Sequence, residues 1–211
     1  MRSQRGFSLT EMLVVTAILL IVGSLSIPNI TRAVDNMRLK AAAQQVASMY
    51  QQGRIQATQD DTYHELLTGG AAGIQTQIWL DLDGDGQWDV GEPLAQMPSQ
   101  VSLINQQSVP AQVNPATLGF APLAVDNSSG TYNQSGLKVQ ALAWNGQGLP
   151  CQRVAPGALC SNQLQTGSVG WVQYLQLQRS INQALYAAVT VSPTGKIKIW
   201  SYSPGANGGW F

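Results

Sequence analysis

The sequence predicts an α+β protein in which a long N-terminal helix packs against an antiparallel β-sheet or small sandwich. Apolar residues recur every three or four positions up to about Thr58, which indicates one face of a helix. After glycines at 69, 70 and 73, apolar and polar residues alternate in several segments, as is typical of half-buried strands. The 211 residues provide for one ordinary domain with an appendage.

The chain begins with a short basic leader that is followed by an apolar run. The leader MRSQRG contains Arg2 and Arg5, and Glu11 is the only ionisable side chain from Phe7 to Ile27. As a helix this run would be about 31 Å long, which matches the ~30 Å hydrocarbon core of a bilayer. Because basic residues stay on the cytoplasmic side, we expect a single-pass segment with the remaining chain on the far side.

A secretory signal and a plain membrane anchor are the alternatives for this run. A secretory signal has an apolar region of about 7–15 residues and a small-residue cleavage site, whereas this run is longer and lacks such a site. A plain anchor does not explain Glu11, because a charge in a membrane helix costs about 2–3 kcal/mol near the centre and less towards an interface. A membrane-anchored β-domain nevertheless stays open as an alternative.

The string GFSLTEMLVV resembles the N-terminus of type IV pilins and type II secretion pseudopilins: a leader ending in glycine, an aromatic residue, then a glutamate. The resemblance implies that a prepilin peptidase cuts between Gly6 and Phe7, that the new amino terminus is methylated, and that Glu11 serves in assembly with other subunits. It also implies an inner-membrane protein whose head lies in the periplasm or outside the cell, and a helix bent at Pro28.

Physical chemistry agrees with an assembly role for Glu11. Inside lipid, the Glu11 carboxylate of an incoming subunit can pair with the α-amino group of Phe7 on its neighbour. A charge that is costly alone then becomes a contact that sets the register between subunits.

The predicted divisions are a leader (1–6), a transmembrane and assembly helix (7–28), an amphipathic helix (29–60) and a β-rich head (61–211). The apolar stripe that should pack against the head consists of Leu39, Ala43, Val46, Tyr50, Gly53 and Ala57. We expect strands at 74–80, 136–144, 171–178, 184–191 and 196–200, and a loop with one short strand at 106–135.

Three segments occur in the order found in GspH/FimT-like pseudopilins and minor pilins, which they resemble: RLKAAAQQVASMYQQGRIQA, WLDLDGDGQWDVGEPL and TVSPTGKIKIW. The resemblance implies the pilin fold and a structural subunit of a type II secretion pseudopilus or type IV pilus. The residues that follow Arg54 depart from the pattern of this branch. Some FimT-like proteins take part in DNA uptake, so a DNA-binding minor pilin is an alternative, with Lys196 and Lys198 as the candidate contacts.

Residues 81–92, DLDGDGQWDVGE, fill every ligand position of the EF-hand calcium loop. The candidate ligands are Asp81, Asp83, Asp85, Gln87, Asp89 and Glu92. Pro93 blocks a helix directly afterwards, so a structural Ca²⁺ would sit between two strands. A polar hairpin loop without metal is the alternative, since Asp and Gly favour turns.

Cys151 and Cys160 are the only cysteines, and we expect them to form a short disulfide loop worth roughly 2–3 kcal/mol in an oxidising compartment. Two reduced thiols are the alternative. Eleven acids balance eleven bases, so no general field attracts nucleic acid. The chain has one histidine, His64, which we interpret as a surface or capping residue, and no nucleophile, zinc or phosphate-loop motif. We therefore expect neither an enzyme nor a required cofactor.

Overall fold

A computed structural model describes most of the chain. The described residues are 8–70, 75–113, 115–125, 141–152, 160–161, 163–164, 167–168, 170–180, 183–203 and 209–211. The predicted cleavage site at Gly6 and Phe7 lies outside them, as does the first part of the strand predicted at 136–144. The side chains of residues 25–29 also lie outside the description, so bending at Pro28 stays a prediction.

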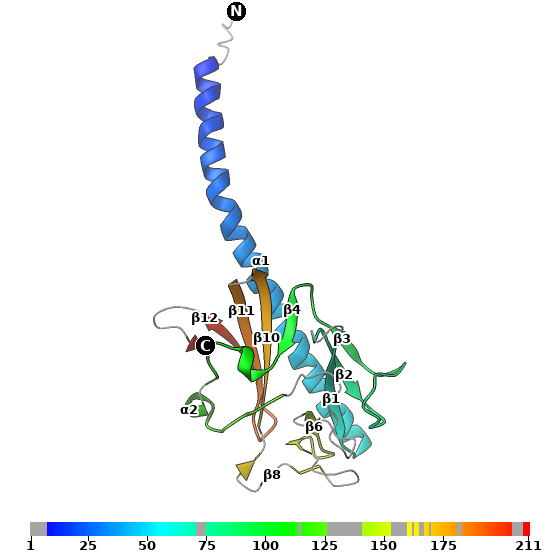
Figure 1. Cartoon of the computed structure of the whole chain (residues 1–211). Helices are drawn as coiled ribbons and strands as arrows, with labels where there is room; N and C mark the ends of the chain where they lie inside the picture. The colour runs from blue at the N-terminus through cyan, green and yellow to red at the C-terminus, as the bar shows by residue number, and fades with distance from the viewer. Residues whose placement is uncertain are drawn as a thin grey trace, which may run out of the picture. The chain divides into compact units, whose positions relative to one another are not determined.

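One long helix, α1, runs from Leu9 to Asp60 (Figure 1). Ser8 caps its start, because the Glu11 N–H donates to Ser8 Oγ at 3.2 Å and to Ser8 O at 3.1 Å. Serine followed three residues later by glutamate is the capping-box pattern, which supplies partners to amides that the helix leaves unpaired. The predicted end of the helix near Thr58 is close to the observed end.

The contacts divide the chain into two compact units, Met1–Met37 and Arg38–Phe211. In the first unit the large apolar side chains between Leu9 and Val22 are exposed. Among the described residues, no helical stretch combines the length and apolarity that crossing a membrane requires.

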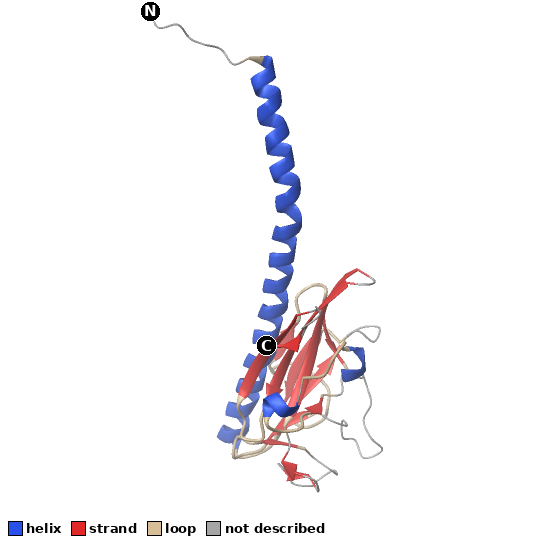
Figure 2. Ribbon diagram, turned by 90° about the vertical axis from the view of Figure 1, so that its left-hand side faces the viewer, coloured by secondary structure: helices blue, strands red, loops and turns tan. Residues whose placement is uncertain are grey.

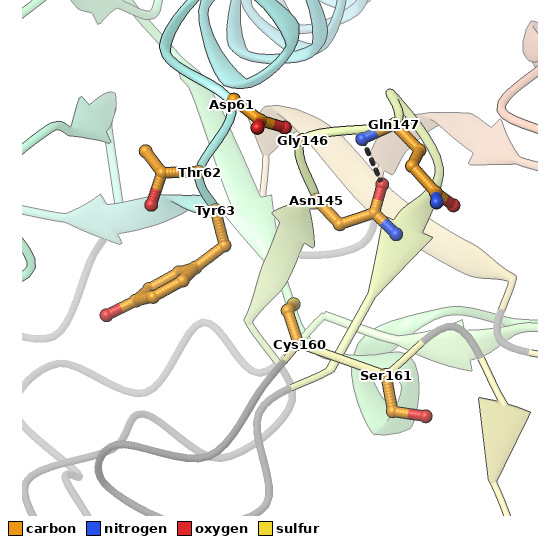
Figure 3. A pocket seen from close by; sticks show the side chains of 8 residues that line it. All are labelled: Asp61, Thr62, Tyr63, Asn145, Gly146, Gln147, Cys160 and Ser161. Carbon is orange, nitrogen blue, oxygen red and sulfur yellow. Dashed lines mark hydrogen bonds between the residues drawn. The ribbon is translucent and has the colours of Figure 1, made fainter.

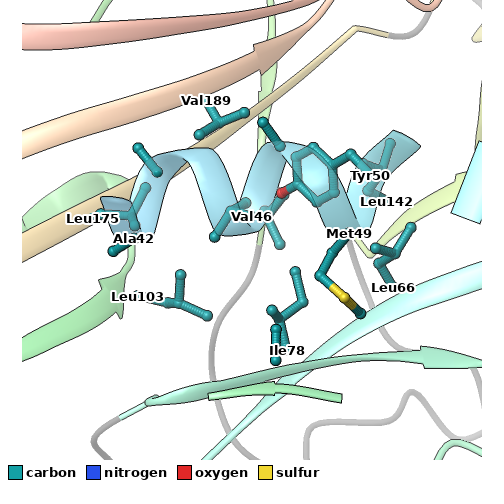
Figure 4. Close-up of a cluster of buried hydrophobic side chains, with 14 of the residues drawn as sticks. Ala42, Val46, Met49, Tyr50, Leu66, Ile78, Leu103, Leu142, Leu175 and Val189 are labelled. Carbon is teal, nitrogen blue, oxygen red and sulfur yellow. The ribbon is translucent and has the colours of Figure 1, made fainter. Parts of the chain in front are cut away.

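In the second unit, the predicted apolar stripe of α1 is buried in the core of the head. Leu39, Ala43, Val46, Tyr50 and Ala57 are all at most 5% exposed, which confirms the stripe. Figure 4 shows this face of α1 amid side chains from both sheets: Leu66, Ile78, Leu142, Leu103, Leu175 and Val189. The burial explains why the stripe is apolar, since a side chain such as Leu39 or Val46 contributes about 1.5–3 kcal/mol when it is removed from water.

The head contains two larger sheets, seen with α1 in Figure 2. The first has the strand order β3-β2-β1-β6-β7, and the second has β13-β12-β11-β10-β4. The strands of the first are β1 (His64–Gly69), β2 (Gln77–Asp81), β3 (Leu94–Gln96), β6 (Leu142–Trp144) and β7 (Pro150–Cys151). Those of the second are β4 (Val101–Ile104), β10 (Trp171–Ser180), β11 (Gln183–Val191), β12 (Ile197–Ser203) and β13 (Gly209–Trp210).

Every pairing within these two strand orders is antiparallel, which confirms the predicted α+β class. The short β5 (Leu123–Ala124) adds to β10 in parallel, and β8 (Gln163–Leu164) pairs with β9 (Gly167–Ser168). In the segment predicted as loop with one short strand, β5 is accompanied by two helical pieces, η1 (Gln106–Ser108) and α2 (Pro115–Leu118).

The second sheet buries apolar side chains on both of its faces. Ile197 and Ile199 of β12 pack towards α1, whereas Trp200 joins a second cluster with Val113, Val172 and other residues on the opposite face. Successive side chains of a strand point to opposite faces, so adjacent residues must enter different clusters. Trp200 is therefore buried, although not on the face of its two isoleucine neighbours.

Candidate functional site

The described part of the N-terminal segment is a helix with an apolar, exposed surface and one carboxylate near its start. Glu11 lies in the first turn of α1, where a negative charge interacts favourably with the helix dipole. Its neighbours Met12 and Leu13 are exposed. Sequence reasoning missed Ser8, although the Ser-x-x-Glu spacing was a readable signal for a helix start.

The acidic loop connects β2 to β3 and is organised by Asp81 at the end of β2. The Asp81 side chain is only 2% exposed, and its two carboxylate oxygens accept hydrogen bonds from the Gly84 and Gly86 amides at 2.7 and 2.9 Å. Both glycines have φ near +81°, a conformation that strains other residues. These two glycines let the chain curl around the Asp81 carboxylate.

Three of the predicted calcium ligands come together in this loop. Carboxylate oxygens of Asp81, Asp83 and Asp85 all lie within 4.8 Å of one another. Two oxygens that each bind one Ca²⁺ at about 2.4 Å can be at most about 4.8 Å apart, so this spacing fits a shared ion.

The two other predicted carboxylate ligands, Asp89 and Glu92, do not join that group. Glu92 closes the loop instead, because its two oxygens accept hydrogen bonds from the Leu82 amide at 2.7 Å and the Asp89 amide at 3.1 Å. The backbone amide of Gln87 donates to Asp85 Oδ1 at 2.7 Å. The loop is thus held by carboxylates that bind backbone amides, as in a polar hairpin loop.

Burial and like charges disfavour ionisation in the acidic loop. Burial raises the pKa of Asp81 to about 6, although the Gly84 and Gly86 amides oppose the shift and the charges of Glu92 and Asp83 add to it. The charge of Asp85 is the main cause of a raised pKa at Asp89. A cation bound among the carboxylates would relieve this repulsion.

Calcium binding stays a prediction, and calorimetry of the full chain in detergent checks it. We expect heat of binding at millimolar Ca²⁺ or below, within the range of about 10⁻⁴–10⁻³ M for weak extracellular sites. The double variant Asp83→Asn and Asp85→Asn should lose that heat while Asp81 still holds the loop. Equal heats for the variant and the unmodified chain would exclude this site.

A disulfide and a polar pocket lie beyond the end of α1. Cys151 and Cys160 form the predicted disulfide, with their Cα atoms 5.4 Å apart. A pocket of about 520 Å³ lies beside it and is shown in Figure 3. Its lining comprises Asp61, Thr62, Tyr63, Asn145, Gly146, Gln147, Cys160 and Ser161.

Close packing shapes one wall of this pocket. Asp61 adopts φ +48°, and a Cβ at Gly146 would lie only 2.7 Å from Asp61 Oδ1, so glycine is required there. Asn145 Oδ1 accepts hydrogen bonds from the Gln147 and Leu149 amides, both at 3.0 Å, and the first of these is drawn in Figure 3. The side-chain oxygen of Asn145 therefore stabilises the turn that Asn145 itself begins.

His64 is buried, which corrects its interpretation as a surface residue. It begins β1 and is 4% exposed. Its Nε2 lies 2.9 Å from Asp60 Oδ2, and Gln56 Nε2 donates to the same oxygen. The hydrogen bonds from Gln56 and His64 lower the pKa of Asp60. The pair of His64 and Asp60 joins the end of α1 to β1. That the protein is not an enzyme stays an expectation.

Lys196 and Lys198, the candidate nucleic-acid contacts, line one hollow of about 190 Å³. The other lining residues are Thr117, Leu118, Phe120, Thr190, Ser192 and Trp200. The Lys198 Nζ atom lies 3.5 Å from the centre of the Trp200 ring, a cation–π contact. The hollow is therefore lined by two basic side chains together with apolar and hydroxyl-bearing side chains.

Comparison with known proteins identifies the N-terminal segment alone. Residues 1–27 match the family described as the prokaryotic N-terminal methylation motif. No curated protein and no solved structure matches the chain. The motif supports a type IV pilin-like protein that a prepilin peptidase processes and that assembles with other pilins. The match ends at Ile27, so it does not distinguish between branches of such proteins.

Proposed function

We propose that this protein is a structural subunit, a minor pilin or pseudopilin, of a type IV pilus or a type II secretion pseudopilus. The observation that carries the proposal is the N-terminal methylation motif at residues 1–27. An α+β head on the same chain supports it, because the helix α1 continues from the motif into the core of that head.

In this proposal the N-terminal segment has two successive roles. Before assembly, the apolar run from Phe7 to Ile27 holds the chain in the inner membrane, with the head in the periplasm. The exposed apolar side chains of α1 between Leu9 and Val22 are available for contact with lipid and later with the helices of other subunits. Cleavage after Gly6 creates the amino group on Phe7 that Glu11 of the next subunit can pair with.

The DNA-binding alternative receives little support from the basic hollow. Lys196 and Lys198 would supply two phosphate contacts. Non-specific binding depends on the number of phosphates neutralised, and two contacts give weak, strongly salt-dependent affinity. A structural subunit therefore explains the motif and the head with fewer additional assumptions.

Intact-mass analysis tests the proposal directly. The chain is expressed in hosts with and without a prepilin peptidase, and the expected product in the first host lacks residues 1–6 and carries one methyl group. A Gly6→Leu variant is the matched control and should keep its full mass in both hosts. An uncut unmodified chain that stays in the membrane would replace the proposal with the plain membrane-anchored β-domain.

A further inference from the structure

We propose that the acidic loop of one molecule docks in the basic hollow beside β12 of a second copy of this chain. The acidic loop here means residues 81–92, and the basic hollow means the eight residues that line the 190 Å³ cavity. This contact goes beyond the proposed function, because neither surface belongs to the N-terminal segment and the contact requires neither cleavage nor methylation.

The acidic loop presents apolar side chains to solvent beside exposed acidic side chains. Val90 is 96% exposed and Trp88 is 45% exposed, and both stand at the end of the loop beside the exposed Asp85 and Asp89. Exposed apolar patches that are rimmed by polar residues mark interaction sites. Trp88 is held in place, since its Nε1 donates to Glu92 O at 3.2 Å.

The basic hollow has the complementary chemistry. Leu118, Phe120 and Trp200 contribute apolar side chains to its lining, and its two lysines, Lys196 and Lys198, are exposed. Neither Asp89 nor Lys196 forms an ion pair within the described residues. An apolar side chain such as Val90 therefore has a cavity to enter, and the acids around it have the Lys196 ammonium group to meet, with the Lys198 ammonium group close by over the Trp200 ring.

The two surfaces can meet only between molecules. In Figure 1, β12 and α2 lie on one flank of the head, and β2 and β3 lie on the other. Both flanks belong to the same compact unit, Arg38–Phe211. A contact between different surfaces of two copies is heterologous, and such contacts repeat into rings or open filaments. The structure thus assigns a heterologous contact between the globular heads of two copies. Such a contact suits a chain that adds copies in one direction.

Site-specific cross-linking of the full, uncut chain tests this contact. One tagged copy carries Val90→Cys, the other carries Thr117→Cys at the hollow, and both are mixed in detergent at low salt with a chelator. The native Cys151–Cys160 disulfide occupies the remaining thiols. We expect at least about tenfold more linked product than for Val90→Cys with Ile55→Cys, an exposed position on α1.

Charge reversal separates docking from association through the N-terminal helices. Lys196→Glu in the hollow copy should lower the yield about tenfold, and Asp89→Lys in the loop copy should restore it. Both side chains are exposed, so both variants should fold. Equal yields with the Ile55 control, dominance of the Val90-to-Val90 product, or a yield insensitive to Lys196→Glu would each overturn the proposal. None of these outcomes bears on whether the peptidase cuts the chain.

Discussion

Glu11→Gln is expected to leave cleavage intact and to lower incorporation of the chain into filaments by roughly one hundredfold. Glutamine can still serve at this position of the capping box, so the start of α1 near Ser8 is preserved. What is lost is the negative charge that the amino group of Phe7 on a neighbouring subunit would pair with. A charge left unpaired in lipid costs about 2.5–3.5 kcal/mol, which corresponds to a factor of roughly one hundred.

The control for this variant is Ser8→Ala, which removes the hydroxyl cap at 3.2 Å but keeps the charge of Glu11. We expect about 1 kcal/mol of lost helix stability and little change in incorporation. The measurement is the amount of cleaved chain in purified filaments relative to the amount in the membrane. If both variants reduced incorporation equally, Glu11 would act through the helix start rather than through its charge.

Trp144→Ala is expected to destabilise the head by about 3–5 kcal/mol, a large part of the 5–15 kcal/mol that folded domains have. Trp144 is fully buried on β6 and stacks under the Arg54 guanidinium, whose Cζ lies 5.7 Å from the ring centre. Arg54 Nη1 also donates to Gly195 O at 3.2 Å, in the turn between β11 and β12. The ring thus joins α1 to both sheets.

Truncation at this position measures packing and stacking alone. Within the described part of the chain, Trp144 Nε1 has no hydrogen-bond partner that the truncation would remove. The ring is tightly enclosed, because a Cβ at Gly53 or Gly195 would come within 3.3 or 3.2 Å of its atoms. The protein cannot easily collapse into the space that the ring leaves, which places the expected cost in the upper part of the range.

Thermal unfolding of the full chain in detergent, followed by near-UV circular dichroism, checks this prediction. For a head of this size, a loss of 3–5 kcal/mol should lower Tm by roughly 10 °C. Trp88→Ala is the matched control, because Trp88 is exposed in the acidic loop and donates one hydrogen bond. Its expected cost is about 1 kcal/mol. Similar shifts for the two variants would contradict the role assigned to Trp144.

Local patterns predicted the buried face of α1 and two strands of the second sheet. The stripe of α1 that includes Val46 and Tyr50 is buried as its spacing indicates, and the alternating segments at 171–178 and 184–191 lie within β10 and β11. The helix has one solvent-facing side, so its apolar residues recur at the helical period, whereas β10 and β11 are buried on both faces and were identified by their alternating residue types.

The strand β1 could not be predicted from an alternation of apolar and polar residues. His64–Gly69 is buried at every position except the last, so no solvent-facing residue marks its alternation. It contains His64 and Glu65, which look like surface residues in the sequence but are covered in the fold. Only the surrounding strands β2 and β6 and the pairing of His64 with Asp60 make this segment a central strand.

The sequence by itself carries the N-terminal methylation motif, because a basic leader, a glycine and one carboxylate in an apolar run follow one another along the chain. It also predicted the disulfide, since two cysteines allow one pairing within the chain, and the structure decided between that pairing and two reduced thiols. The tertiary structure alone decided that Asp81, Asp83 and Asp85 gather while Glu92 closes the loop. It also decided that the acidic loop and the basic hollow lie on opposite flanks. The physical reason is that the direction of a loop side chain depends on the backbone amides it can reach, and those come from residues brought near only by folding.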